Sequence, residues 1–326
     1  MNRVSNFAAV GLICGAAFIL ALPAFSFLPQ LTAGHVDQWS LAAFPIQWNL
    51  NPAAGSNITG SAGVATVITN SFATWIASPN TTLPVTQGSN SAVSSESSSP
   101  PNINLICFVC SDVQFGGTET LAETITTTAD AAGQSDGHGG TSQFAGQIIK
   151  ADIAFNPGVQ FNTGGSGGTG QDMQTVATHE IGHFFGLDHS AITRAVMYPF
   201  APDVLTTLSY DDVAAISSLY PKSSSDVATG TISGAVTLNG TAVFGGHVYA
   251  NSTTSATPFS AFPNIRKTPI GTLTLTDGTY LITGVPADSY IVISEPLDLP
   301  VSDSDVSWAS EFGKSAVQTN FTTRWH

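Results

Sequence analysis

The stretch of sequence that decides the fold of this chain is His179-Glu180-Ile181-Gly182-His183-Phe184-Phe185-Gly186-Leu187-Asp188-His189. Residues four apart lie on one face of a helix, so His179 and His183 can hold one metal ion between them. Glu180 lies about 100° further round the helix, where its carboxylate can reach a water on that metal. Gly186 permits the left-handed turn that ends a helix and brings His189 back as a third ligand. Three imidazoles with an open fourth position are the coordination of a catalytic zinc ion.

A second motif follows the histidines. Met197 lies eight residues beyond His189, in Ala195-Val196-Met197-Tyr198-Pro199. A bare His-Glu-x-x-His pentapeptide also arises by chance, with its histidines exposed or satisfied in a core. The glycine and third histidine at fixed offsets, with a methionine-containing turn, make up the full metzincin signature. We therefore predict a zinc-peptidase site.

Within the metzincins, residues 179–190 together with 196–199 resemble the matrixins, and most of all their bacterial relatives. Ser190 directly after the third histidine and Tyr198 directly after the methionine fit that branch. Astacins and serralysins place a metal-reaching tyrosine where Pro199 stands here. The resemblance implies an α+β catalytic domain with a twisted mixed sheet and an active-site helix, and it covers most of residues 27–221.

The resemblance also implies the chemistry, which is hydrolysis of peptide bonds in proteins by a zinc-activated water. His179, His183 and His189 would hold Zn²⁺, and Glu180 would act as general base. Met197 would lie beneath the metal as packing rather than as a ligand.

The residues after the methionine bear on substrate choice. Tyr198, Pro199 and Phe200 are expected to form a wall of the pocket for the substrate residue that follows the scissile bond. Matrixins usually carry a tyrosine two residues after that proline, and Ala201 stands there here. The depth of the pocket is therefore open.

Hydrophobic periodicity and capping residues predict the elements around this motif. We expect strands over 44–50, 102–107, 121–128 and 148–156, and helices over 60–78, 172–185 and 208–220. Short polar side chains in 121–128 suit an edge strand, where matrixins bind the substrate backbone by strand addition. Asp172 and Ser209 are the expected N-caps of the last two helices.

The N-terminus predicts export. Residues 7–23 are apolar and precede the small-x-small pattern Ala24-Phe25-Ser26, so residues 1–26 are expected to be a signal peptide. An uncleaved anchor is the alternative, although the run is short for a span and lacks a basic flank. We expect a secreted, extracellular protein without stable membrane insertion after cleavage.

The charge balance excludes some partners. Acidic residues outnumber basic ones by 22 to 8, for a net charge of −14, which argues against nucleic acid and anionic membranes.

Structural Ca²⁺ is a candidate ligand for the Gly-rich segment 157–170, with Asn156, Asn162 and Asp172 in it or at its margins and without an assigned ligand set. Vertebrate matrixins hold a second zinc in a nearby Gly-rich loop. His138 is the one histidine there in this chain, so a solvated loop is expected.

Two cysteines, Cys107 and Cys110, follow the expected signal peptide. Export favours a local disulfide, while a redox-active pair and half of a zinc site are the alternatives. A disulfide requires the chain to turn at residues 108–109, because an extended strand holds the two positions too far apart.

The pattern changes after a Ser-rich linker over 222–229. Short alternating strands separated by Asn239-Gly240 and Asp277-Gly278 predict a small all-β sandwich over 230–300. This part resembles carboxypeptidase regulatory-like modules, which implies no chemistry and leaves its partner unknown. Residues 301–326 form a tail without an assignment.

Three functions are consistent with these patterns. The first is a secreted zinc-dependent endopeptidase with protein or peptide substrates. The second is a secreted binding or adhesion protein with an incidental zinc site, and the third is a zinc hydrolase acting on a cell-wall peptide or another non-protein amide. The complete ligand set with Glu180 favours the first.

Overall fold

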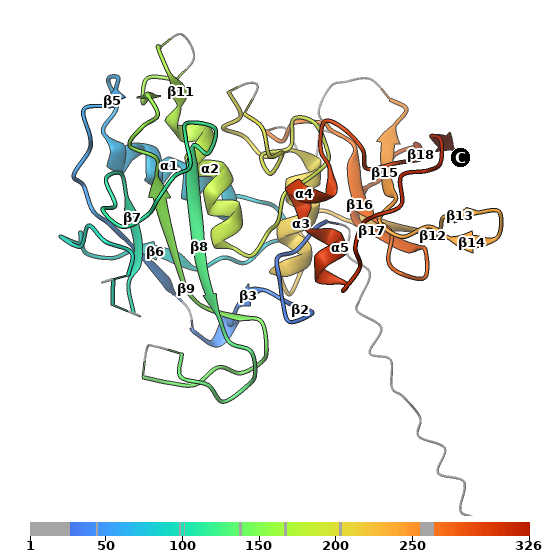
Figure 1. The fold of residues 1–326 in the computed structure, drawn as a ribbon, viewed down its shortest axis with the longest axis horizontal. Coiled ribbons are helices and arrows are strands. Elements are labelled where there is room, and N and C mark those ends of the chain that lie inside the picture. The colour runs from blue at the N-terminus through green and yellow to red at the C-terminus, as the bar shows by residue number, and fades with distance from the viewer. Residues whose placement is uncertain are drawn as a thin grey trace, which may run out of the picture.

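The computed structural model describes residues 27–43, 45–97, 99–100, 102–136, 139–165, 168–201, 204–254 and 264–326. The expected signal peptide and His138 lie outside these residues. Figure 1 shows an N-terminal part with helices packed on a sheet, and a C-terminal part made mainly of strands. Among the described residues, no helix has both the length and the apolar character needed to cross a membrane.

The N-terminal part is built on a mixed sheet in the order β3-β9-β7-β4-β6, with β8 paired to β9. Its strands are β3 (Gln38–Trp39), β4 (Ile46–Leu50), β6 (Val85–Gln87), β7 (Asn104–Cys107), β8 (Ala122–Thr128) and β9 (Gln147–Phe155). All pairs are parallel except β8 with β9, which is antiparallel. The expected edge strand over 121–128 is therefore confirmed, and the short strand β6 was not predicted.

Smaller strand pairs flank this sheet. They are β1 (Leu31–Thr32) with β2 (His35–Val36), and the parallel set β5 (Ile58–Thr59), β10 (Phe161–Asn162) and β11 (Gln171–Asp172). A short 3₁₀ helix, η1, spans Leu41–Ala43. Strand β11 leads directly into the helix that begins at Met173, so the three parallel strands fix where that helix starts.

Two helices pack against each other and the sheet, α1 (Val64–Ile76) and α2 (Met173–Phe184). Phe72 of α1 stacks on Trp48 of the sheet with ring centroids 4.8 Å apart and meets Phe184 of α2 edge-on at 5.4 Å. The indole of Trp75 donates a hydrogen bond to the Thr178 carbonyl at 2.8 Å. These buried aromatic contacts set the position of α2 on the sheet.

A third helix, α3 (Tyr210–Leu219), closes the N-terminal part. It begins at the N-cap Ser209, whose side chain accepts from the Asp212 backbone, so the expected cap is confirmed. After the helix, the Tyr220 hydroxyl donates to the Phe185 carbonyl at 2.7 Å and accepts from the Trp39 backbone at 3.0 Å. Tyr220 thus joins α3, the end of α2 and strand β3.

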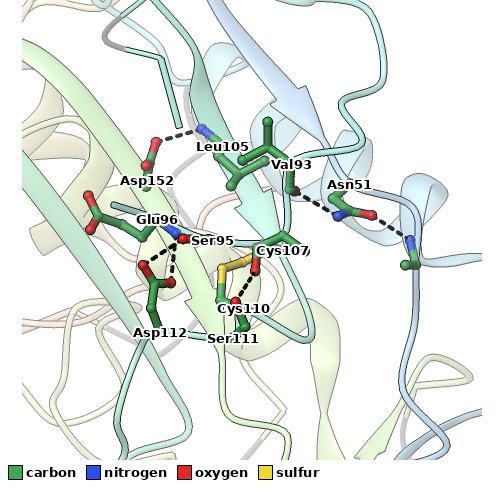
Figure 2. Close-up of a disulfide and its surroundings, with 12 residues drawn as sticks. Asn51, Val93, Ser95, Glu96, Leu105, Cys107, Cys110, Ser111, Asp112 and Asp152 are labelled. Carbon is green, nitrogen blue, oxygen red and sulfur yellow. Dashed lines mark hydrogen bonds between the residues drawn. A yellow bond between two sulfur atoms is a disulfide. The ribbon is translucent and has the colours of Figure 1, made fainter. Parts of the chain in front are cut away.

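The structure joins Cys107 and Cys110 by a disulfide, with their Cα atoms 5.7 Å apart (Figure 2). The turn after it holds the neighbouring loop, because the Ser111 backbone donates to the Ser94 carbonyl at 2.8 Å. The Asp112 carboxylate accepts from the Ser95 hydroxyl at 2.7 Å. The Cys107–Cys110 turn therefore helps to hold this loop in place. Neither cysteine lines the cleft described below.

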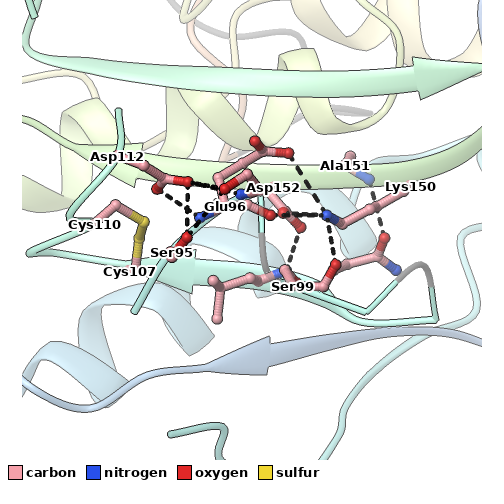
Figure 3. A network of polar contacts seen from close by, with 12 residues as sticks. Ser95, Glu96, Ser99, Cys107, Cys110, Asp112, Lys150, Ala151 and Asp152 are labelled. Atoms are coloured by element: carbon pink, nitrogen blue, oxygen red, sulfur yellow. Dashed lines mark hydrogen bonds and ion pairs between the residues drawn. A yellow bond between two sulfur atoms is a disulfide. The ribbon is translucent and has the colours of Figure 1, made fainter. Parts of the chain in front are cut away.

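A buried ion pair within strand β9 also contacts the same loop (Figure 3). The Lys150 ammonium lies 2.7 Å from the Asp152 carboxylate and 3.6 Å from Glu96. The second oxygen of Asp152 accepts from the Leu105 backbone at 2.7 Å. Because Lys150 and Asp152 are both buried, loss of either side chain would leave the charge of the other uncompensated.

The C-terminal part consists of a two-stranded sheet, a hairpin and a four-stranded sheet. They are β12 (Thr229–Ala235) with β17 (Thr279–Pro286), β13 (Thr237–Leu238) with β14 (Thr241–Ala242), and β16 (Ile270–Leu273), β15 (His247–Ser252), β18 (Tyr290–Glu295) and β19 (Arg324–Trp325) in that order. The turn predicted at Asn239-Gly240 joins β13 to β14, and both residues have positive φ, 52° and 81°.

The two parts share one hydrophobic core. Buried residues of the C-terminal strands, including Ile270 and Ile282, belong to the same cluster as Val213 and Ile216 of α3. The unassigned tail also folds, into α4 (Asp303–Val306), α5 (Trp308–Glu311) and β19. In Figure 1, α4 and α5 lie between α2 and the C-terminal strands. The C-terminal part is therefore packed onto the N-terminal part through α3 and this tail.

One buried carboxyl in the N-terminal part gives the stability a pH dependence. Asp37 is 4% exposed, and burial raises its pKa from 3.8 to about 7, although a hydrogen bond from Thr32 opposes the rise. The folded state favours the neutral form, so this contribution to stability is complete below about pH 4 and is lost as the pH rises through about 7.

Asp37→Asn cannot ionise, so the free energy of unfolding of this variant should fall less between pH 5 and pH 8 than that of the parent. Urea titrations at both pH values measure the difference. Asp130→Asn, at an exposed position, is the control and should follow the parent. Parallel pH profiles for Asp37→Asn and the parent would contradict the assignment.

Candidate active site

Helix α2 and the turn after it present the three histidines. Asp172 caps the helix by accepting from the Thr175 backbone at 2.8 Å, which confirms the expected N-cap. The chain then leaves the helix at Gly186, whose φ of 91° disfavours a side chain. The N-terminal segment lies along this turn, since the Gln30 backbone donates to the Gly186 carbonyl at 2.9 Å and the Asp188 backbone to the Leu28 carbonyl at 2.8 Å.

The imidazoles converge through their Nε2 atoms. The Nε2 of His183 lies 3.1 Å from that of His179 and 3.3 Å from that of His189. One ligand atom from each histidine lies within 4.8 Å of the others. Tetrahedral zinc with Zn–N bonds of about 2.0–2.1 Å places its nitrogens about 3.3 Å apart, so the spacing fits that ion.

Each imidazole is held by a backbone carbonyl on its other nitrogen, Nδ1. The carbonyls are those of Val196 for His179 at 2.7 Å, Leu187 for His183 at 2.7 Å and Asp305 for His189 at 2.6 Å. A carbonyl only accepts, so each Nδ1 carries the proton and donates it. Burial lowers the pKa of all three imidazoles, which keeps them neutral. Three Nε2 lone pairs then face one another, an arrangement that a cation between them stabilises.

Glu180 lies in the same cleft and is 6% exposed. Its carboxylate accepts a hydrogen bond of 2.6 Å from the Thr124 hydroxyl on the edge strand β8. Burial raises the pKa of Glu180 from 4.5 to about 7, and the bond from Thr124 opposes the rise. A carboxyl in this range can both accept and return a proton near neutral pH.

The methionine turn packs beneath the histidines. Met197 is 2% exposed and its side chain contacts Gly182 of α2. The Asp212 carboxylate accepts from the backbones of Val196 at 2.9 Å and Met197 at 3.1 Å. Because Val196 supplies the carbonyl that holds His179, Asp212 positions that ligand indirectly. The same Asp212 side chain also completes the capping box of α3 with Ser209.

Two further aspartates hold the segment around His189. The Asp188 carboxylate accepts from the His189 backbone at 2.7 Å, and burial raises the pKa of Asp188 to about 8. Asp211 accepts from the Ser190 hydroxyl at 2.5 Å and from the Gly271 backbone at 2.9 Å. Asp211 therefore links the turn after the third histidine to the C-terminal strands.

The histidines and Glu180 open into a cleft with a volume of about 920 Å³. One wall comes from residues 118–124, at and before β8, and another from residues 198–201. The structure thus places Tyr198, Pro199 and Phe200 in the lining, together with Ala201. Asp305 and Ser307 of the tail also line the cleft, and nothing in the sequence pointed to them.

The asparagines suggested as calcium ligands form hydrogen bonds to backbone carbonyls of the protein. Asn162 donates to the Gly165 carbonyl at 2.6 Å and Asn156 to the Thr120 carbonyl at 2.7 Å. Within the described ranges, the histidine triad is the one group of three His, Cys, Asp or Glu side chains close enough to share an ion. Structural Ca²⁺ stays a prediction.

The metzincin class is defined by a helix with two zinc-binding histidines, a glycine turn that brings in the third, and a methionine turn beneath them. The histidine motif and the methionine turn come together here in one site. Within that class, residues 122–221 match the family model described as Matrixin. This stretch runs from β8 to just past α3 and contains all three histidines, so the chain carries a matrixin-type metzincin domain.

Three proteins are similar in sequence to part of this chain. The chain is 41% identical over 73 residues to karilysin of Tannerella forsythia, a match covering 20% of this chain and 16% of karilysin. It is 36% identical over 98 residues to the hatching enzyme of Paracentrotus lividus, covering 29% and 16%. It is 37% identical over 97 residues to matrix metalloproteinase-25 of Homo sapiens, covering 27% and 17%. The chain therefore spans about one-sixth of the length of these relatives.

Gly182 offers a test of the packing beneath the metal site. A Cβ at this position would meet the Met197 sulfur and lie 2.9 Å from the Trp75 ring. An alanine in a helix normally adds about 1 kcal/mol of stability over glycine, whereas overpacking a core costs about 1–3 kcal/mol.

We expect Gly182→Ala to lower the melting temperature and to weaken zinc binding, since a shifted Met197 moves the Val196 carbonyl. Thermal unfolding and chelator competition measure the two effects. Gly116→Ala has open space for the added methyl group and is the control. A higher melting temperature for Gly182→Ala would show that the turn is not tightly packed on α2.

Proposed function

We propose that this protein is a secreted zinc-dependent endopeptidase that hydrolyses peptide bonds within proteins. The observation that carries the proposal is the convergence of three Nε2 lone pairs beside Glu180 in an open cleft. The matrixin match over 122–221 supports it. Secretion rests on the expected signal peptide over 1–26.

The edge strand β8 supports binding of an extended polypeptide. β8 pairs with β9 on one side, and among the described strands none pairs with its other side. Residues 118–124 line the cleft beside Glu180. A substrate in extended conformation can add to this edge through backbone hydrogen bonds, which brings its scissile carbonyl to the histidines.

The residues of the site divide the work of hydrolysis. His179, His183 and His189 would hold Zn²⁺, which when bound supplies a Lewis acid that acidifies water and polarises a carbonyl. Glu180 takes a proton from the attacking water as the water oxygen bonds to the carbonyl carbon. As the carbon–nitrogen bond breaks, Glu180 gives that proton to the leaving amine. Thr124 holds the Glu180 carboxylate in place between these steps.

The division of the chain follows the same proposal. Residues 27–221 form the catalytic domain, 222–229 a linker and 230–300 a carboxypeptidase regulatory-like β-sandwich. The strands β12 to β18 support the last assignment by their positions and their antiparallel pairing.

Glu180→Gln tests the mechanism, because glutamine keeps the shape of the side chain and cannot take up the proton. We expect kcat/KM on a mixed peptide library to fall by about 10²–10⁴-fold, with zinc bound at one ion per chain as in the parent. Turnover follows from mass-spectrometric product analysis, and zinc content from elemental analysis.

His183→Ala is the companion variant and should lose both zinc and turnover. Retained cleavage by Glu180→Gln would refute the role of Glu180 as base. A parent protein that binds zinc and cleaves no peptide or protein would favour a binding or adhesion function instead.

A further inference from the structure

We propose that the C-terminal segment Ser302–Trp308 is a built part of the metal site, which positions the third zinc ligand and lines the cleft. The inference rests on the proposed function for its zinc ion. It concerns residues outside 122–221, the stretch that matches the matrixin family.

The first observation is the origin of the three carbonyls that hold the imidazoles. Those for His183 and His179 come from residues 4 and 17 positions away in the chain. The carbonyl for His189 belongs to Asp305, which is 116 positions away, and their hydrogen bond of 2.6 Å is the shortest of the three. A chain ending after α3 would leave the Nδ1 of His189 without this partner.

The second observation is the way the Asp305 carbonyl is presented. Asp305 lies in the single turn of α4, where carbonyls near the end of a helix lack partners within it. The turn is held at its start by Ser302, whose backbone and hydroxyl both donate to the Asp305 carboxylate at 2.8 Å. The side chain of Asp305 therefore fixes the turn while its carbonyl remains directed at His189.

The third observation is the anchoring of the segment to both parts of the molecule. Val306 and Trp308 are 1% and 2% exposed, and they belong to a buried cluster that includes Tyr198 of the cleft wall and Leu273 of β16. The Trp308 indole donates to the Thr274 carbonyl at 3.2 Å. Asp305 and Ser307 line the cleft, so this segment is placed to contact a substrate as well as a ligand.

A hydrogen bond to the outer nitrogen of a ligating histidine fixes its tautomer and orientation, and loss of such a partner typically weakens metal binding about 10–100-fold. Asp305 is a positioning residue in this sense, acting through its backbone. The proposal therefore predicts that zinc affinity depends on the packing of Trp308, which is not itself one of the proposed ligands.

The test compares two tryptophan variants of the full chain. Trp308→Ala releases the segment, whereas Trp325→Ala, at a position 72% exposed in β19, is the matched control. Zinc dissociation constants come from chelator competition, with circular dichroism as the check on folding. We expect an increase of about 10–100-fold for Trp308→Ala and none for Trp325→Ala. An unchanged constant for folded Trp308→Ala would overturn the proposal.

A second pair of variants, which disturbs the fold less, tests the proposal if Trp308→Ala misfolds. Ser302→Ala removes the part-buried hydroxyl bond to Asp305 and leaves the apolar core intact. Ser315→Ala, at an exposed position further along the same tail, leaves that bond in place and is the control. We expect zinc binding to weaken in Ser302→Ala and not in Ser315→Ala. Equal affinities in this pair would also overturn the proposal.

The affinity readout separates this inference from the proposed function. A parent that binds zinc and cleaves nothing would defeat the proposed function, and the comparison of zinc affinities would still decide the role of the segment. A parent that binds no zinc would overturn both.

Discussion

The hydrogen bonds from three imidazole Nδ1 atoms to backbone carbonyls are the constraint on which the rest of the site depends. They fix the tautomers of His179, His183 and His189, so that three lone pairs converge. Each of these three carbonyls must itself be held in a fixed position. The Gly186 turn holds the one from Leu187, Asp212 holds the backbone of Val196, and the Ser302 cap holds Asp305.

Helix α3 connects the constraint to the rest of the molecule. Its first turn carries Asp211, which reaches both Ser190 and the backbone of Gly271, next to Asp212, which holds the methionine turn. Its apolar face shares one core with the C-terminal strands. A displacement of those strands would therefore be transmitted to the histidines through α3 as well as through α4. The C-terminal part is an integral support of the site in this structure.

The sequence predicted what depends on local spacing. Helices α1, α2 and α3 were placed within a few residues, whereas α4 and α5 were not predicted. The three histidines lie together as the His-Glu-x-x-His-x-x-Gly-x-x-His pattern requires. It did not predict Asp305, because a backbone carbonyl leaves no trace in residue identity and 116 residues separate it from His189. Strand β6, with three residues, was too short to show a period, and the link between Asp212 and Met197 depends on tertiary packing.

The order of the chain gives the last ligand contact a consequence for biosynthesis. The histidines enter the growing chain long before Asp305, and N-terminal regions generally fold first during synthesis. A nascent chain that has reached only α3 holds two of the three carbonyl supports and lacks the third. Full zinc affinity would then arise only once the α4 segment has been made and has docked. The protein would in this way acquire its tightest metal binding only after synthesis has passed residue 308.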